Sequence, residues 1–294
     1  MNISLLTTDF PGYALLDSGD RRKLEDFGGV RIVRSEPKAW WKPTLPREEW
    51  AKAVAVHEDD SREGRWKFRG NAAPEPWTLR FRGAFSLQLR FMDRSKQIGV
   101  FPEQSPHWDR ILKNPVPATG KPMRLLNLFG YTGAASLAAA RAGWRVTHVD
   151  ASKPAVAWGR RNQELSGLGD APIRWILEDA VKFCRREARR GNVYEAILLD
   201  PPAFGRGPGG ELWKVERDLP ELLRVCRDLL SPDARLMILT LYTIDASSVL
   251  CGNLLAETTA HLRGGNVEFG ELATRETSAA ARLLPLSLWG RWTR

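Results

Sequence analysis

The stretch RLLNLFGYTGAASLAAARAGWRVTHVD, residues 124–150, constrains this chain more than any other part of its sequence. Arg124–Phe129 is a nearly continuous apolar run, which predicts a strand covered on both faces. Gly130 and Gly133 then bracket a tight turn. The alanine- and leucine-rich segment Ala134–Arg141 predicts a helix whose small side chains let it lie close to a sheet.

The same stretch continues into a second strand that ends on an acid. Gly143 stops the helix at the position where a glycine commonly follows the last helical turn. Val146–Val149 predicts the next strand, and Asp150 follows it. In open α/β sheets, ligands bind beyond the carboxyl ends of the strands, and an acid after the second strand holds a ribose. The sequence therefore predicts a nucleotide-like ligand near Asp150.

The sequence of the glycine turn indicates which class of nucleotide-like ligand fits. A dinucleotide-binding turn reads G-x-G-x-x-G, because its middle glycine lets the backbone approach a pyrophosphate. Here the turn reads G-Y-T-G, with Tyr131 and Thr132 between two glycines. This pattern favours a ligand with an adenosine and no pyrophosphate, and S-adenosylmethionine is the natural candidate. The alternative is a glycine-rich turn in an ordinary βαβ unit that binds no ligand.

Helix and strand patterns alternate after residue 150, as in an α/β domain with a mostly parallel sheet. Helices are predicted at 154–165, 180–190, 214–230 and 246–262, and strands at 173–177, 194–199, 235–240, 267–272 and 286–292. We therefore assign residues 124–294 to one α/β domain.

The preceding part is β-rich and predicts a small substrate-recognition domain at residues 1–94, followed by a proline-rich connector at 95–123. Alternation of apolar and polar residues is typical of half-buried strands. Strands are predicted at 30–34 and 52–57, an antiparallel meander at 65–69, 78–82 and 85–90, and one connector helix at 106–113.

Acids end two more predicted strands. Glu178 and Asp179 follow the strand at 173–177 and can accept a hydrogen bond from the exocyclic amine of an adenine. Alternatively, Asp179 only caps the next helix.

The strand at 194–199 ends in L-D-P-P-A-F. Pro201 and Pro202 stiffen this loop, and rigid alignment favours an in-line displacement. Asp200 or the Pro201 carbonyl can accept a hydrogen bond from a target base, and Phe204 can stack on it. Alternatively, the prolines only form a turn. The glycine-rich segment Gly205–Gly210 is predicted to be mobile and able to close over a substrate.

Composition bounds the class of protein. A formal net charge of +9 suggests a polyanionic partner, although a mildly basic balance is also common in proteins that never bind nucleic acid. Three cysteines without C-x-x-C spacing and four scattered histidines predict neither a disulfide framework nor a metal site. No run approaches the roughly 20 apolar residues that span a bilayer, and the N-terminus lacks a signal-peptide pattern. We expect a cytoplasmic protein that does not bind a membrane.

Basic and aromatic residues interleave in the predicted meander, as on sheets that bind RNA. They are Arg62, Arg65, Lys67, Arg69, Arg80, Arg82 and Arg90 with Trp66, Phe68, Trp77, Phe81 and Phe85. The same alternation equally fits a half-buried sheet with an aromatic inner face and a solvated basic outer face.

Four motifs in order, N-L-F-G-Y-T-G, V-D-A-S, E-D-A and L-D-P-P-A-F, resemble class I S-adenosylmethionine-dependent methyltransferases. More narrowly, they are similar to bacterial ribosomal large-subunit RNA methyltransferases that modify cytosine C5 or guanine N7. The match covers about residues 95–245, and the β-rich region ending in G-V-F-P-E-Q resembles the family's central β domain. The resemblance implies a Rossmann-like, mostly parallel seven-stranded sheet with helices on both faces. We expect no additional N-terminal RNA-binding module.

The resemblance also implies site roles. The residues expected to border the cofactor are Gln104, Asn127, Phe129, Gly130, Tyr131, Thr132, Gly133, Asp150, Ala151, Ser152, Glu178, Asp179 and Asp200. Among them, Asp150 would hold the ribose hydroxyls and Asp179 would meet the adenine. Asp200 would lie between cofactor and substrate, and Gln104 would approach the cofactor from the connector.

One departure from the family pattern bears on the methylated atom. Methylation at cytosine C5 needs a thiolate that attacks C6, because C5 alone is a poor nucleophile. Family members with this activity carry a cysteine soon after the fifth strand, whereas this chain reads L-T-L-Y-T at 239–243. Cys226 and Cys251 fall in predicted helices, as buried inert thiols do. A base nitrogen is therefore the favoured acceptor.

The sequence thus predicts an enzyme that methylates a base in structured RNA, such as ribosomal RNA. One alternative is a methyltransferase of a small molecule or a protein side chain. A second is a non-catalytic RNA-binding protein that retains the cofactor fold, and a nicotinamide oxidoreductase is a more distant one. The sequence leaves the oligomeric state open.

Overall fold

The computed structural model describes residues 3–58, 64–70, 74–93, 95–117 and 121–294, so Arg62 lies outside the described residues. The chain divides into two compact units. Unit 1 contains Met1–Leu6, His107–Leu272 and Ser287–Arg294, and unit 2 contains Thr7–Pro106 and Ala273–Leu286.

Unit 1 is organised around an eight-stranded sheet. Its spatial order is β1 (Ile3–Thr7), β16 (Asn266–Arg275), β17 (Leu283–Thr293), β15 (Leu236–Leu241), β12 (Ala196–Leu199), β9 (Arg124–Leu128), β10 (Arg145–Asp150) and β11 (Ile173–Leu177). The five strands from β15 to β11 are parallel, and β17 is antiparallel to β15. The chain moves from β9 outward through β10 and β11 and then returns to β12 beside β9. This reversal places the topological switch point, where ligands bind in such sheets, between β9 and β12.

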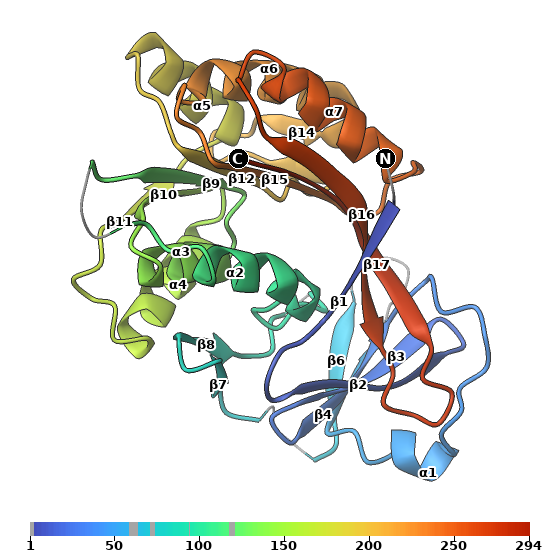
Figure 1. Ribbon diagram of the computed structural model, residues 1–294. Helices are drawn as coiled ribbons and strands as arrows, with labels where there is room; N and C mark the ends of the chain where they lie inside the picture. Colours follow the sequence, from blue (N-terminus) through green and yellow to red (C-terminus); the bar gives the residue numbers. More distant parts are fainter. Residues whose placement is uncertain (1–2, 59–63, 71–73, 94, 118–120) are drawn as a thin grey trace. The chain divides into compact units, whose positions relative to one another are not determined.

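Helices cover both faces of this sheet (Figure 1). One face carries α2 (Ser105–Leu112), α3 (Ala134–Arg141) and α4 (Lys153–Leu165), and the other carries α5 (Ala180–Arg189), α6 (Val215–Leu229) and α7 (Val249–Thr259). The core on the second face joins alternate strand residues, such as Ile197 and Leu199, to helix residues, such as Phe183 and Leu222. All four residues of β12 are buried, which explains why the central strands read as continuous apolar runs.

The predicted α/β class and the class I methyltransferase arrangement are confirmed in unit 1. The sheet has one strand more than the predicted seven, because β1 from the start of the chain pairs with β16 at its edge. The pattern I-S-L-L-T marks a strand without indicating which sheet it joins.

Unit 2 contains a five-stranded sheet and a separate hairpin. The sheet order is β2 (Tyr13–Gly19), β3 (Arg22–Phe27), β4 (Val30–Ser35), β5 (Ala55–Glu58) and β6 (Arg65–Phe68), and the hairpin pairs β7 (Trp77–Phe81) with β8 (Phe85–Leu89). Two short helices, α1 (Arg47–Trp50) and the 3-10 helix η1 (Pro102–Gln104), complete the unit. Gly28 and Gly29 both have positive φ in the β3–β4 turn, a conformation that favours glycine.

The predicted three-stranded meander is wrong. β6 is antiparallel to β5, whereas β7 and β8 pair with each other as a two-stranded sheet. Alternation correctly indicated which side chains point inward, but it carries no information on the partner strand.

The aromatic residues of this region pack inward. The rings of Trp66, Phe68 and Trp77 lie 4.7, 5.0 and 5.5 Å from the ring of Phe91. Phe81 and Phe85 are also buried, with 0% and 1% of their surface exposed.

Two of the interleaved cations form ion pairs with acidic residues of the same unit. Lys67 forms an ion pair with Glu58 at 2.6 Å, and Arg82 forms one with Asp9. With the aromatic residues packed inward, the arrangement agrees with the half-buried alternative, an aromatic inner face and a basic outer one.

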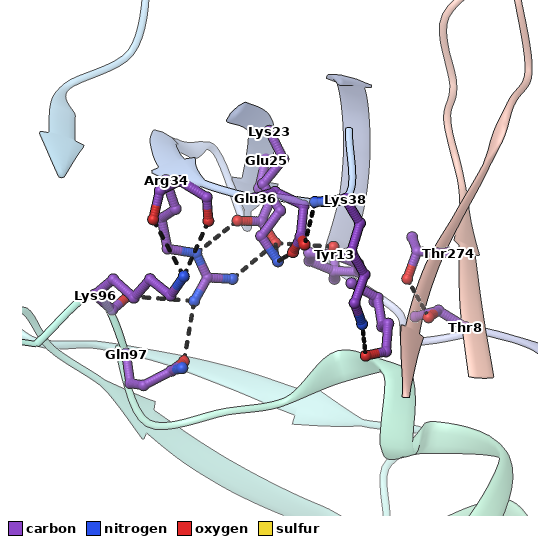
Figure 2. Close-up of polar contacts among 12 residues, drawn as sticks. Thr8, Tyr13, Lys23, Glu25, Arg34, Glu36, Lys38, Lys96, Gln97 and Thr274 are labelled. Atoms are coloured by element: carbon purple, nitrogen blue, oxygen red, sulfur yellow. Dashed lines mark hydrogen bonds and ion pairs between the residues drawn. The ribbon is translucent and has the colours of Figure 1, made fainter. Parts of the chain in front are cut away.

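A buried charge network lies in unit 2 (Figure 2). Arg34 donates two hydrogen bonds of 2.7 Å to the carboxylate of Glu25, and Tyr13 donates a third of 3.0 Å. Burial opposes ionisation of Glu25, but the charges of Arg34 and Lys23 outweigh it and lower the pKa of Glu25 to about 2. This bidentate pair fixes β3 against β4 through side chains as well as through the strand ladder.

The two units differ in extent from the segments assigned from sequence. Residues 273–286 belong to unit 2, because β16 and β17 are 10 and 11 residues long and continue beyond unit 1. The predicted connector, 95–123, is divided between the units at Pro106 and His107. The recognition role of the β-rich region remains a prediction.

Candidate functional site

Four predicted site segments meet along one edge of the unit 1 sheet. The register aligns Leu128 of β9 with Val149 of β10 and Leu199 of β12, and it aligns Asp150 with Leu177 of β11. The residues that follow these positions therefore form a row at the carboxyl edge: Phe129, Asp150, Glu178, Asp200 and, after Leu239 of β15, Thr240. This row spans the switch point between β9 and β12.

The glycine turn after β9 has an unusual backbone. Phe129 and Tyr131 both adopt left-handed conformations, with φ of 57° and 50°, although neither is glycine. Such residues cost about 1–3 kcal/mol each and persist only where the surroundings enforce them, commonly at ligand sites. Here the Gly130 amide donates to the Val149 carbonyl at 3.1 Å, and the Gly133 amide donates to the Gly130 carbonyl at 3.0 Å.

Both glycines are required by close packing. A Cβ atom at Gly130 would lie 2.4 Å from Cε1 of His148, and one at Gly133 would lie 2.6 Å from Cη2 of Trp175. Gly133 also has φ of 87°. The sequence interpretation of a tight turn is consistent with this geometry.

Asp150 holds the turn in place. Its Oδ2 accepts a hydrogen bond of 2.8 Å from the Tyr131 amide, and its Oδ1 accepts one of 2.8 Å from the Ser152 amide. Burial raises the pKa of this carboxyl above its usual value, and the two amides oppose the rise. Each carboxylate oxygen retains a second lone pair, so Asp150 can shape the turn and still accept ribose hydroxyls.

Asn127 contacts the helix that follows the turn. Its Nδ2 donates to Ser136 Oγ at 2.9 Å, and Ser136 Oγ lies 3.0 Å from Nδ1 of His148. These three buried polar side chains form a connected chain, and two of them, His148 and Asn127, pack against Gly130. Burial explains why the pKa of His148 falls to about 3 and the ring stays neutral.

The acids after β11 have separate partners. Asp179 caps α5, with Oδ1 accepting a hydrogen bond of 2.9 Å from the Lys182 amide. Its Oδ2 makes no hydrogen bond within the described residues. Glu178 forms an ion pair with Arg186, so its carboxylate is already engaged. Asp179 therefore keeps an oxygen that can accept a further hydrogen bond, and its contact with an adenine remains a prediction.

The D-P-P-A-F loop is fixed at three points. Thr240 Oγ1 donates to Oδ1 of Asp200, and Trp213 Nε1 donates to the Pro202 carbonyl at 2.7 Å. The Val215 amide donates to the Ala203 carbonyl at 3.0 Å. Pro201 is buried within this loop.

The glycine-rich segment after Phe204 is structured. It forms a hairpin of β13 (Phe204–Arg206) and β14 (Leu212–Lys214). Phe204 has 71% of its surface exposed, and the Lys214 ammonium lies 5.9 Å from its ring centroid. The ring is therefore available for stacking.

Sequence reasoning missed Thr240 and Trp213. Thr240 is the one polar residue inside the apolar run L-M-I-L-T-L of β15, and this signal could have identified it. Trp213 follows a glycine-rich segment and gives no local signal, because its partner Pro202 contacts it only in the folded hairpin.

Gln104, which the resemblance assigns to the cofactor, lies in η1 of unit 2 and is 8% exposed. Its role remains a prediction.

Ala151 and Ser152 follow Asp150, and Ser152 caps α4 by accepting a hydrogen bond of 3.3 Å from the Ala155 amide.

The three cysteines lie in helices on one face of the sheet. Cys184, Cys226 and Cys251 are free thiols buried in the core on the α5–α7 face. Burial raises the pKa of Cys251 to about 12. A hydrogen bond with Cys226, together with burial, raises the pKa of Cys184. Thiolates are the reactive form of cysteine, so these thiols are inert.

Among the described residues, no group of histidine, cysteine and acidic side chains could hold a metal ion. No described helix is both long enough and apolar enough to cross a bilayer.

Comparison with known proteins identifies the family. The model of the S-adenosylmethionine-dependent methyltransferase family matches residues 81–269. A solved S-adenosylmethionine-dependent methyltransferase from Agrobacterium tumefaciens is 45% identical, with a TM-score of 0.93, covering 100% of this chain and 94% of that one. A solved structure with bound SAH, SMU.776, is 19% identical over 96% of this chain and 75% of that one, with a TM-score of 0.70, and shares the fold.

Two curated relatives are named ribosomal RNA large subunit methyltransferase K/L. The protein from Pseudomonas paraeruginosa is 39% identical over 46% of this chain, and that from Shewanella frigidimarina is 35% identical over 44%. This chain spans 18% of the length of each.

The donor set at the carboxyl edge fits S-adenosylmethionine. The turn is closed by Asp150, which has acceptor capacity left for a ribose, and Asp179 has an unused oxygen for an amine. With the family match over residues 81–269, these observations establish that the chain belongs to the S-adenosylmethionine-dependent methyltransferases and uses S-adenosylmethionine as its methyl donor.

Proposed function

We propose that this enzyme methylates a nitrogen atom of a base in structured RNA, with ribosomal RNA as the first candidate. The observation that carries the proposal is the D-P-P-A-F loop, which holds Asp200 in the same row as Asp150 and ends on the exposed Phe204. The names of the curated relatives support an RNA substrate.

The cofactor would be held by the row of residues described above. Asp150 would bind the ribose, Asp179 the adenine amine, and the turn from Phe129 to Gly133 the methionine part. When bound, S-adenosylmethionine supplies an electrophilic methyl group on a sulfonium.

The chain's own residues would position the acceptor. Asp200, oriented by Thr240, can accept a hydrogen bond from an exocyclic amine or ring N–H of the target base, and so can the Pro201 carbonyl. Phe204 would stack on the extruded base, an interaction worth about 1–3 kcal/mol. Three fixed points on the loop keep the acceptor aligned for in-line attack, and such alignment can lower a barrier by several kcal/mol.

A nitrogen acceptor follows from the inert cysteines. The lone pair of a base nitrogen can attack directly, whereas C5 of cytosine requires a thiolate. All three thiols are buried on the α5–α7 face. An amine acceptor would then lose its proton after transfer, and the Asp200 carboxylate would accept it.

The test compares transfer of a radiolabelled methyl group from S-adenosylmethionine to total RNA and to ribosomal subunits from a deletion strain. Asp200→Asn should reduce transfer by about 100-fold, because misplacement of the acceptor has effects of that size. Its affinity for adenosylhomocysteine should change little. Asp170→Asn, at an exposed loop position, is the matched control.

Nucleoside analysis of the same RNA identifies the product. A methylated base nitrogen that is missing in the deletion strain would support the proposal, and a 5-methylcytosine would contradict it. Methyl transfer to small molecules or proteins, with no salt-dependent RNA affinity, would favour the alternative substrate class. Unchanged RNA modification with intact cofactor binding would favour a non-catalytic protein.

A further inference from the structure

Unit 1 has a cavity at the opposite edge of its sheet from the row of residues assigned to the cofactor. Its volume is about 340 Å³. The lining residues include Met123, which precedes β9, Trp144, which precedes β10, and Arg235, which precedes β15. These positions are the amino ends of the parallel strands, and the cavity is therefore distinct from the site described above.

The charge of this cavity is entirely positive. Four basic residues line it, Arg110, Lys113, Arg235 and Arg294, and no acidic residue does. A cavity beside α5 and α6 instead mixes three basic residues with four acidic ones.

Three of the four cations have no side-chain partner in the part of the chain that the structure describes. The side chains of Arg110, Lys113 and Arg235 make no ion pair or hydrogen bond among the described residues. Arg294 donates to the carbonyls of Arg263 and Pro232, at 3.1 and 2.8 Å. Like charges gathered without a counter-charge repel each other, so an anion would relieve this repulsion.

A buried donor gives a second and independent observation. Trp144 has 4% of its surface exposed, and its indole N–H has no acceptor among the described residues. The indole nitrogen can only donate. Buried donors are normally satisfied, and an unsatisfied one calls for a ligand or water.

We propose that this cavity binds a phosphate group. Phosphate oxygens accept charge-assisted hydrogen bonds from arginine and lysine. Trp144 lines the same cavity, so its indole N–H could donate a hydrogen bond to a phosphate oxygen there. The site goes beyond the methyl transfer proposed above. Its phosphate belongs either to the RNA backbone or to a free nucleotide, and the experiment separates these two sources.

The test titrates the full-length protein with orthophosphate and with adenosine monophosphate at constant ionic strength, using calorimetry. Arg110→Gln combined with Arg235→Gln should weaken binding at least about tenfold, as expected for the loss of hydrogen bonds to a charged group. Trp144→Phe retains the ring and removes the donor, and should weaken binding about threefold or more. Arg224→Gln, at an exposed position on α6 outside the cavity, should leave binding unchanged.

A parallel measurement of RNA affinity shows whether the bound phosphate group belongs to RNA or to a free phosphate compound. If the double variant also binds RNA more weakly than Arg224→Gln does, the site takes a backbone phosphate. If RNA affinity is unchanged while orthophosphate binding is lost, the site takes a free phosphate compound. Equal affinity of wild type and double variant for orthophosphate, nucleotide and RNA would overturn the proposal. Lys113→Gln, at an exposed position, repeats the test if the double variant fails to fold. Activity on short substrates reports separately on methyl transfer.

Discussion

At the scale of single residues, the site requires a glycine that has no side chain at position 130. Gly130 has no side chain because the ring of His148 occupies that space, and His148 in turn contacts Ser136, which contacts Asn127. The turn is thus held by packing against this buried polar chain and by the hydrogen bonds that Asp150 accepts. The strain at Phe129 and Tyr131 is maintained by these contacts rather than by local preference.

Gly130→Ala tests this packing. The new methyl group would lie 2.4–2.5 Å from two atoms of the His148 ring, so the turn or the ring must move. We expect a loss of about 1–3 kcal/mol in the free energy of unfolding, as for other overpacked sites. We also expect weaker binding of adenosylhomocysteine, measured by calorimetry. Gly169→Ala is the control, because a Cβ there meets nothing within 4 Å. Equal cofactor affinity in both variants would contradict this account.

At the scale of elements, the hairpin of β13 and β14 connects two loops of the site. Trp213 on β14 donates to the Pro202 carbonyl, and its ring lies 5.0 Å from the ring of Phe129. One side chain therefore connects the reacting loop to the glycine turn, although Trp213 and Phe129 are far apart in sequence. The glycine-rich segment Gly205–Gly210, which the sequence predicts to be mobile, lies in the same hairpin just before Trp213.

Trp213→Phe should separate this connection from simple packing. The variant keeps an aromatic ring and loses one hydrogen bond, so the free energy of unfolding should fall by about 0.5–1.5 kcal/mol. The kcat for methyl transfer should fall by more than stability alone explains, with little change in KM. Trp40→Phe also removes an indole hydrogen bond to a proline carbonyl, at an exposed position, and should leave kcat unchanged. Equal kcat values for wild type and Trp213→Phe would show that the connection has no catalytic effect.

At the scale of the whole molecule, acid stability should depend on the buried pair of Glu25 and Arg34. The pKa of Glu25 lies near 2 in the folded chain, below its usual value of 4.5. A lowered pKa contributes stability that is fully present above pH 4.5 and is lost as pH falls toward 2. Removing one partner of a buried ion pair typically costs about 3–5 kcal/mol.

Glu25→Gln should therefore lower the free energy of unfolding by about 3–5 kcal/mol at pH 7 and flatten its dependence on pH between 4.5 and 2. Denaturant titrations at a series of pH values measure both effects. Glu164→Gln is the control, because its ion pair with Arg161 is exposed and worth little. An unchanged slope below pH 4.5 would show that other carboxylates dominate acid unfolding.

The sequence by itself determined the parts of the protein that depend on neighbouring residues. The strand, turn, helix and acid of residues 124–150, the cap at Asp179, and the order of elements from β9 to β12 all follow from local patterns. Each uses hydrogen bonds or periodicities that act within a few residues.

Only the tertiary structure decided which distant segments meet. It placed β1 in the large sheet, paired β6 with β5, and carried β16 and β17 through both units. It also brought Thr240 to Asp200, Trp213 to Pro202, and four cations and Trp144 to the lining of one cavity. Strand pairing and side-chain burial are long-range contacts, and a pattern of alternating residues satisfies several of them equally well. The methyl donor was therefore readable from residues 124–150, whereas the loop connection through Trp213 and the positively charged cavity required the fold.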